Sequence, residues 1–154
     1  MSSTARTRPP LRQVIDITAT TPARPAAVYA LLADGASWPS WSPIDSFELE
    51  REGAGAPEGV GAVRRFRNGR VDGRDTIVEL VPDRRLGYTH VSSLPIKDYR
   101  ATVDLEPDGA GTRIHWRASF RPVVPGTGAV LRIALRRFLR QCAERLADHA
   151  ARGG

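Results

Sequence analysis

The three histidines, at positions 90, 115 and 149, are the side chains best suited to move protons near neutral pH. Their spacing fits no metal site. In "LGYTHVSS", strand alternation places Leu86, Tyr88 and His90 on one face. If that face lines an apolar interior, His90 could serve as a general acid or base. The alternative, which the pattern favours, is a histidine on the solvent side of a strand.

Arg64 is the second candidate, because the segment "VGAVRRF" places it on an apolar face. It shares that face with Val60, Ala62 and Phe66. An arginine in such a place needs a partner, since an unpaired buried charge is costly. The partner is either a buried acid such as Asp75 or Glu79, or an anionic or enolate oxygen of a ligand. Structural pairing is the favoured reading.

The stretch "WPSWSP" places Trp38 and Trp41 three residues apart in a proline-broken turn. Such large apolar side chains either close the end of a core or line the mouth of a hollow. We expect packing at the end of a pocket first and ligand contact second. Asp45, just after this turn, is a candidate at the pocket lip, with capping of a strand end as the alternative.

The elements that would position these residues are mainly strands. "LRQVIDITATT" predicts a first strand, and a helix follows from Pro25 to about Gly35. From residue 44 to 121, about six strands alternate with turns, among them the hairpin signal Asn68-Gly69. Two strands alternate cleanly, with these residues on their apolar faces: Tyr99, Ala101, Val103 and Leu105; Ile114, Trp116, Ala118 and Phe120. If Trp116 points inward, His115 points outward.

The pattern then changes to helical spacing. Apolar residues recur every three or four positions at Leu131, Leu135, Phe138, Cys142 and Leu146. Arginines occupy the other face of this long helix, and we expect that face to be solvated rather than to bind a partner. Strand, short helices, antiparallel strands and one long helix predict an α+β architecture with all helices on one face of the sheet.

Composition narrows the classes of function. The net charge of +6 comes mainly from the two ends, because residues 1–12 carry three arginines and no acid, and residues 128–152 carry six arginines against two acids. This distribution argues against a nucleic-acid footprint. The single cysteine, Cys142, permits no internal disulfide. We expect a disordered basic tail at 1–10, one domain at 11–150, and a cytoplasmic protein without signal peptide or membrane-spanning helix.

No classical catalytic signature is present: there is no phosphate loop, nucleophile elbow or zinc-protease motif. The glycine-rich "GAGAPEG" is read as a hairpin turn, because it does not lie between a strand and a helix.

The chain resembles the START-like or SRPBCC superfamily, in its polyketide cyclase/dehydrase branch. The resemblance runs from residue 11 to about 150 through "VIDITATTPARPAAVYALLADGASWPSWSP", "GVGAVRRF", "VELVPDRRLGY", "GTRIHWRASFRP" and the terminal helix. It implies a helix-grip fold, in which a curved antiparallel sheet surrounds a long C-terminal helix and encloses a deep apolar cavity. The superfamily shares no catalytic residues, so none is carried over.

From this resemblance we expect a hydrophobic, lipid- or polyketide-like ligand, with cyclisation or dehydration as the enzymatic reading. A non-catalytic carrier or sensor and a regulatory interaction module remain alternatives. The candidate catalytic residues are His90, Tyr88 and Arg64. The candidate ligand-binding residues are Trp38, Trp41, Asp45, Tyr99, Trp116, Phe66, Leu135 and Phe138. We expect no cofactor, no metal, no nucleic-acid partner, and a monomer or homodimer.

Overall fold

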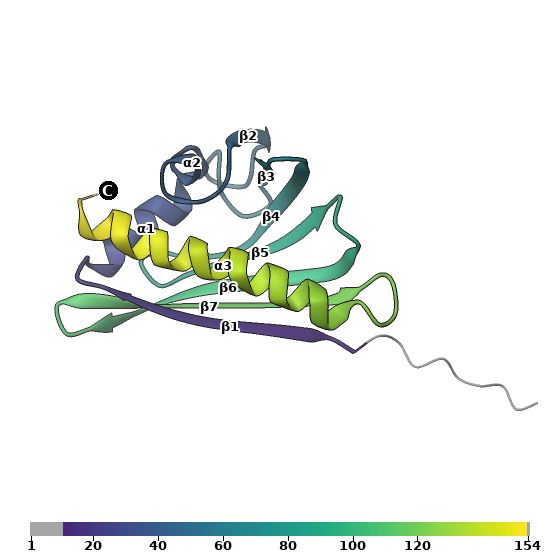
Figure 1. Cartoon of the computed structure of the whole chain (residues 1–154). Coiled ribbons are helices and arrows are strands. Elements are labelled where there is room, and N and C mark those ends of the chain that lie inside the picture. Colours follow the sequence, from purple (N-terminus) through teal and green to yellow (C-terminus); the bar gives the residue numbers. More distant parts are fainter. Residues whose placement is uncertain (1–10, 154) are drawn as a thin grey trace, which may run out of the picture.

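The computed structural model describes residues 11–153 and consists of one antiparallel sheet with its helices on one side (Figure 1). The predicted tail at residues 1–10 lies outside the described residues. The elements in order are β1 (Gln13–Thr21), α1 (Pro25–Ala33), the 3-10 turn η1 (Gly35–Ser37), α2 (Trp38–Trp41), β2 (Ser46–Arg51), β3 (Val63–Asn68), β4 (Val71–Val81), β5 (Arg85–Ser92), β6 (Ile96–Asp108), β7 (Gly111–Pro122) and α3 (Gly128–Ala151).

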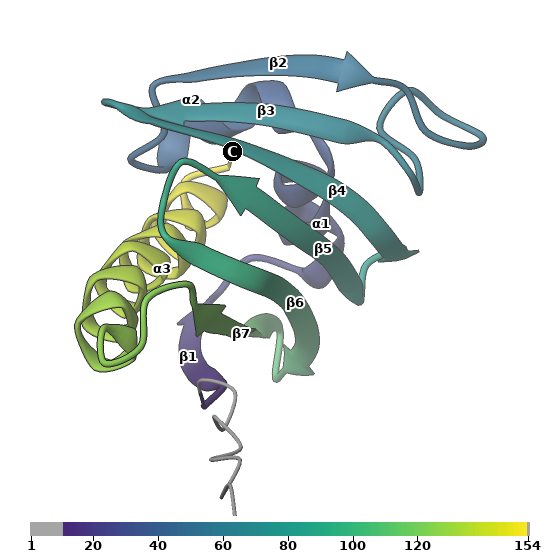
Figure 2. The ribbon, with the colours of Figure 1, turned by 90° about the vertical axis from the view of Figure 1, so that its right-hand side faces the viewer.

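The seven strands form a sheet in the order β1-β7-β6-β5-β4-β3-β2. All neighbouring strands are antiparallel, and β1 is paired with β7, so the chain's first strand returns beside its last. The sheet curves around α3 (Figure 2). On the same concave side, α1 lies against β5 and β6, and α2 lies against β2. The predicted α+β class and helix-grip arrangement are confirmed.

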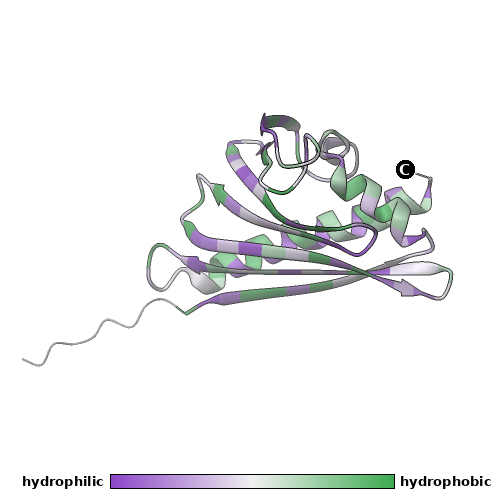
Figure 3. Cartoon of the chain, turned by 180° about the vertical axis from the view of Figure 1, so that it is seen from behind, coloured by the Kyte–Doolittle hydropathy of each residue, from purple (hydrophilic) through white to green (hydrophobic). Residues whose placement is uncertain are grey.

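The clean alternation on β6 and β7 is confirmed. The inward residues of both strands are buried: Tyr99, Ala101, Val103, Leu105, Ile114, Trp116, Ala118 and Phe120. Arg113 and Arg117, between them in sequence, are exposed on the convex face. Figure 3 shows the resulting interchange of hydrophobic and hydrophilic segments along the strands. The sheet therefore has one face packed on the core and one face in water.

The alternation on β4 could not be read from sequence, and the structure gives the reason. The pairing of β4 with β5 shifts register between Ile77 and Glu79. At this bulge Val78 remains 49% exposed, while Asp75 and Ile77 on the preceding part of the strand are buried. A bulge inserts one residue and so changes which side chains face the core.

The terminal helix α3 changes character along its length. Its C-terminal half is anchored by fully or nearly fully buried side chains: Leu139, Cys142, Ala143, Leu146 and Ala147. Leu131, Leu135 and Phe138 in its N-terminal half are only partly buried. The predicted stripe is therefore present, but only its second part packs tightly. Within residues 11–153, no helix combines the length and apolar composition needed to cross a bilayer.

Candidate functional site

A cavity of about 240 Å³ lies between the N-terminal half of α3 and the concave face of the sheet. Most of its lining is apolar, which favours a hydrophobic occupant. The apolar and aromatic side chains that line it are Trp38, Ile44, Phe66, Val71, Tyr88, Leu94, Tyr99, Trp116, Leu131, Ala134, Leu135, Phe138 and Leu139. Four polar residues share the lining, Arg67, Asn68, Asp75 and His90.

A row of inward-facing polar residues crosses four strands of the sheet. Arg64 on β3 pairs in register with Asp75 on β4, Asp75 with His90 on β5, and His90 with Tyr99 on β6. Adjacent positions in neighbouring strands place their side chains on the same face within contact distance. Three members of the row, Asp75, His90 and Tyr99, line the cavity.

His90 is bonded to Asp75 inside the cavity. Its Nδ1 lies 2.5 Å from Asp75 Oδ1, and the side chains are 20% and 11% exposed, respectively. The carboxylate holds the imidazole in one orientation and engages Nδ1, which leaves Nε2 as the nitrogen able to exchange a proton with a ligand. The favoured sequence reading of a solvent-facing histidine is therefore wrong, because β5 turns His90 toward the cavity.

Gly73 provides the space that the His90 ring occupies. A Cβ built on Gly73 would lie 2.5 Å from His90 Cε1, closer than any real contact of that kind. A glycine within a strand often marks a close approach of a neighbouring group, but the sequence alone does not show which group approaches Gly73.

Two tyrosine hydroxyls face the same space. Tyr88 accepts a hydrogen bond from Trp116 Nε1 at 3.2 Å, and its ring lies 6.3 Å from that of Tyr99. Burial raises the pKa of the Tyr88 phenol well above its ordinary value of 10, and nearby Tyr99 and Asp75 add to this effect. Burial likewise raises the pKa of Tyr99. Both phenols therefore stay protonated at neutral pH and are available as donors.

The two tryptophans of the proline-broken turn have different positions. Trp38 lines the cavity, where its ring stacks on Phe66 at 5.0 Å and meets Trp116 edge-on at 5.9 Å. Trp41 is 3% exposed, lies outside the lining and packs against Trp38 at 4.7 Å. Each indole N–H is satisfied, by Leu32 O for Trp38 and Ser37 Oγ for Trp41. The turn thus closes the cavity with one tryptophan supported by the other.

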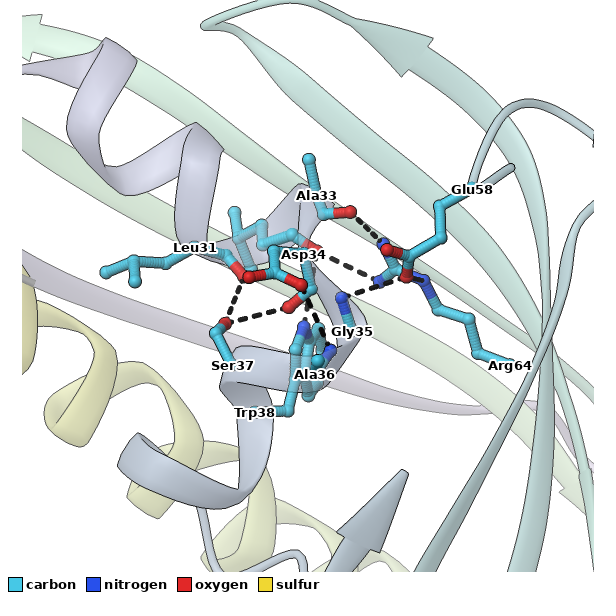
Figure 4. Close-up of polar contacts among 10 residues, drawn as sticks. Leu31, Ala33, Asp34, Gly35, Ala36, Ser37, Trp38, Glu58 and Arg64 are labelled. Atoms are coloured by element: carbon cyan, nitrogen blue, oxygen red, sulfur yellow. Dashed lines mark hydrogen bonds and ion pairs between the residues drawn. The ribbon is translucent and has the colours of Figure 1, made fainter. Parts of the chain in front are cut away.

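Arg64 does not line the cavity, which corrects its candidate catalytic role. Its guanidinium donates to the carbonyls of Leu32 at 2.9 Å and Ala33 at 2.6 Å, and its Nε lies 2.9 Å from Glu58 Oε1 (Figure 4). These carbonyls belong to the last turn of α1, where helical acceptors have no internal partner. The favoured interpretation, structural pairing with an acid, is confirmed, but the acid is Glu58 rather than Asp75 or Glu79, because α1 and the loop at Glu58 supply the partners of the guanidinium.

Glu58 completes this junction and was not recognised from the sequence. Its Oε1 also accepts a hydrogen bond from the backbone N–H of Gly35 at 2.8 Å. Burial lowers the pKa of the Arg64 guanidinium, and the charge of Glu58 is the main opposing influence. Glu58 lies in the glycine-rich segment, which the sequence predicted only as a hairpin turn. Its carboxylate links Arg64 on β3 to the backbone of Gly35, just after α1.

Asp45 also lies outside the cavity lining. Its Oδ2 accepts from the backbone N–H of Gly69 at 2.6 Å, at the tip of the β3–β4 hairpin. Gly69 has a φ of +58°, a conformation that suits glycine in a tight turn. Asp45 therefore caps the backbone of this hairpin, which agrees with the alternative prediction of capping and not with ligand contact.

The remaining predicted contacts, Phe66, Tyr99, Trp116, Leu135 and Phe138, all line the cavity. The sequence missed lining residues on the hairpin tip, Arg67 and Asn68, and on the loop at Leu94. The Asn68-Gly69 pair predicts a hairpin at Arg67 and Asn68. Whether its tip points toward the cavity depends on the curvature of the sheet, which the sequence does not show. Among residues 11–153, no group of three His, Cys, Asp or Glu side chains is arranged to hold a metal ion.

Similar folds are found among solved structures. A START superfamily protein from Mycobacterium smegmatis has a TM-score of 0.79 at 11% identity, over 92% of this chain and 99% of that one. The Zhui aromatase/cyclase from a Streptomyces species has a TM-score of 0.75 at 17% identity, over 92% and 95%. The XoxI protein from Bacillus cereus has a TM-score of 0.69 at 18% identity, over 90% and 94%. At such identities the likeness concerns the fold.

No curated protein matches the sequence. Residues 12–151 match the family described as polyketide cyclase / dehydrase and lipid transport. This span includes all the strands and helices of the described residues and the whole cavity lining. On the strength of that match, supported by the shared fold, the chain belongs to the polyketide cyclase / dehydrase and lipid transport family.

Proposed function

We propose that the protein binds a hydrophobic, lipid- or polyketide-like molecule in the cavity and catalyses its cyclisation or dehydration without a cofactor. The observation that carries this proposal is the His90–Asp75 pair in a mostly apolar cavity. A pure container for an apolar molecule gains nothing from a buried carboxylate, because burying a charge costs free energy. In a proton-transfer site, by contrast, such a carboxylate holds the imidazole in place and stabilises its protonated form.

The chemistry follows from the groups present. His90 Nε2 removes a proton from a carbon next to a ketone, and Asp75 stabilises the imidazolium that results. The enolate oxygen accepts a hydrogen bond from a neutral phenol, Tyr88 or Tyr99. The enolate carbon forms a bond to a second carbonyl carbon of the same chain, and the new alkoxide takes the proton back from His90. In a dehydration, neutral His90 Nε2 removes a remaining proton from the carbon next to the ketone, and the imidazolium that results protonates the hydroxyl, which leaves as water while the carbon–carbon double bond forms.

The size of the cavity restricts the ligand. Pockets for drug-sized molecules have volumes of about 300–1,000 Å³, and 240 Å³ lies below that range. The occupant is therefore compact, of the size of one or two fused rings, or α3 moves outward to admit a longer chain. The partly buried Leu131, Leu135 and Phe138 make the N-terminal half of α3 the wall best able to move.

A carrier or sensor is the second candidate, and the predominance of apolar lining favours it. A carrier binds its ligand equally well when the His90 imidazole is removed and returns the molecule unchanged. An enzyme converts it.

Native mass spectrometry of the protein purified from its own host tests the proposal. We expect a one-to-one apolar adduct, which solvent extraction then identifies. Leu135→Trp fills the cavity and should abolish the adduct, whereas Arg117→Gln on the convex face should leave it unchanged. A cyclised product in the extract supports the enzyme, and an unaltered lipid supports the carrier. An adduct that persists in Leu135→Trp would place the ligand elsewhere and contradict the proposal.

A further inference from the structure

We propose that the end of the molecule where α3 begins docks on an anionic membrane surface, with the cavity mouth toward the bilayer. The surface, here the mouth face, consists of the β7–α3 loop and the N-terminal half of α3, residues 123–140. These segments lie together at one end of the sheet, at the start of α3 (Figure 2).

Charge is distributed unevenly along α3. Residues 128–143 contain Arg132, Arg136, Arg137 and Arg140, all exposed, and no acid. Residues 144–151 contain Glu144 and Asp148 against Arg145. A helix built only for solubility would intersperse both signs along its length. The uncompensated cations are confined to the half of α3 that lines the cavity.

Exposed apolar side chains accompany these cations. Val123 and Val124 in the loop are each 51% exposed, and Val130 and Ile133 on the helix are 70% and 68% exposed. Large apolar residues interleaved with arginines are typical of surfaces that insert shallowly among lipid headgroups. Neither a nucleic acid nor bulk water offers a favourable environment for Ile133 and Val130.

The mouth face continues directly into the cavity. Leu131, Ala134 and Leu135, on the same helical turns, belong to the cavity lining. The loop is tied to the β5–β6 connection by the hydrogen bond from Val123 N to Pro95 O, at 2.9 Å, next to the lining residue Leu94. An apolar molecule would therefore pass between bilayer and cavity along apolar side chains.

The test is cosedimentation of the full-length chain with vesicles of phosphatidylcholine, with and without about 30% phosphatidylserine, which supplies the anionic surface. We expect binding to the anionic vesicles only. Arg137→Gln/Arg140→Gln should weaken binding about 25-fold, because each arginine near such a surface contributes about five-fold. Ile133→Ser should weaken binding several-fold at unchanged charge.

The matched control is Arg145→Gln/Arg152→Gln, which removes the same charge from the other end of α3, where both residues are exposed. Its binding should stay within about two-fold of the wild type. Equal losses in the two double variants would mean a general effect of net charge and would overturn the proposal. Failure of the wild-type protein to bind anionic vesicles would also overturn the proposal. An Ile133→Ser variant with full binding would indicate a purely electrostatic surface for a polyanion and would likewise overturn it.

These readouts need no ligand and no turnover. Membrane docking can therefore fail while the proposed cavity chemistry holds, and the converse is also true. All substituted side chains are exposed, so an unchanged far-ultraviolet circular dichroism spectrum and melting temperature verify that the variants are folded.

Discussion

The sheet carries a histidine–aspartate pair on each of its faces, and the two pairs differ in their surroundings. His90 and Asp75 face the cavity with exposed fractions of 20% and 11%. His115 and Asp16 form a close pair on the convex face, where Asp16 is 56% exposed. Both pairs join neighbouring strands, β4 with β5 and β1 with β7.

The comparison shows that environment, not residue type, makes a candidate site. The two histidines are similarly covered, with His115 26% exposed, but Asp16 is far more open to water than Asp75, so the interaction in the convex pair is screened more strongly. The inner pair lies beside two phenols held neutral by burial and beside an apolar space that a ligand can fill. We therefore expect proton transfer to a bound carbon acid at the inner pair rather than at the convex pair, because a filled cavity excludes competing water.

The largest effect should come from removing the inner imidazole. With β-tetralone as a compact apolar ketone, we expect His90→Gln to slow protein-catalysed exchange of the α-protons with D2O about 100-fold or more, because general base catalysis contributes that much. Asp75→Asn should act in the same direction. His115→Gln is the matched control on the convex face and should leave the rate unchanged. Equal rates in His90→Gln and wild type would remove the inner pair from the chemistry.

Packing on the two faces of β7 gives the next comparison. Trp116→Ala should lower the free energy of unfolding by about 3–5 kcal/mol, because a fully buried aromatic leaves a large void. Arg117→Ala, its exposed neighbour, should change that free energy by less than about 0.5 kcal/mol. Urea denaturation measures both. A small loss for Trp116→Ala would mean that the cavity collapses readily around the missing indole.

The buried phenols of Tyr88 and Tyr99 should make the free energy of unfolding depend on alkaline pH. Below pH 10 the phenols of Tyr88 and Tyr99 are protonated in both folded and unfolded chains. Above pH 10 the unfolded chain ionises them, while burial keeps the folded-state pKa values higher. The unfolding free energy should therefore fall by about 1.4 kcal/mol per pH unit for each phenol.

Denaturation at pH 9 to 11 measures this slope, and Tyr88→Phe/Tyr99→Phe should flatten it. Tyr29→Phe is the comparison and should flatten the slope less, because that side chain is only partly buried, although its burial also raises the pKa of its phenol. A double variant with the wild-type slope would assign the alkaline sensitivity to other groups.

The smallest effect concerns the space beside the imidazole. Gly73→Ala should displace the His90 ring and lower the ketone exchange rate about ten-fold, because a misplaced catalytic group loses orientation. Gly87→Ala is the control, since its Cβ would meet Glu79 Cβ at 3.1 Å and lies away from His90. Equal rates in both variants would mean that the ring tolerates a shift.

Most of the fold could be predicted from the sequence because its signals were local. Regular alternation on β6 and β7 identified the core face, and the spacing of Leu131 to Leu146 identified α3. Asn68-Gly69 marked the hairpin that fixes the register of β3 and β4. Each of these signals depends on residues that are close together in the chain.

The candidate site was less accessible because it depends on contacts between distant residues. The bulge between Ile77 and Glu79 concealed the face of Asp75, so its pairing with His90 could not be foreseen. Arg64 was placed correctly inside, but its partners lie on α1 and on the loop at Glu58. Trp38 and Trp41 have similar sequence surroundings, and only packing assigns one to the cavity.

The most direct test of the central claim observes both histidines in one spectrum. Two-dimensional NMR of the imidazole rings would be recorded before and after adding the apolar extract of the host cells. We predict that the His90 ring resonances shift as the cavity fills, while those of His115 stay fixed. Movement of His115 alone, or a filled protein whose His90 resonances do not move, would contradict the assignment of the inner pair to the ligand site.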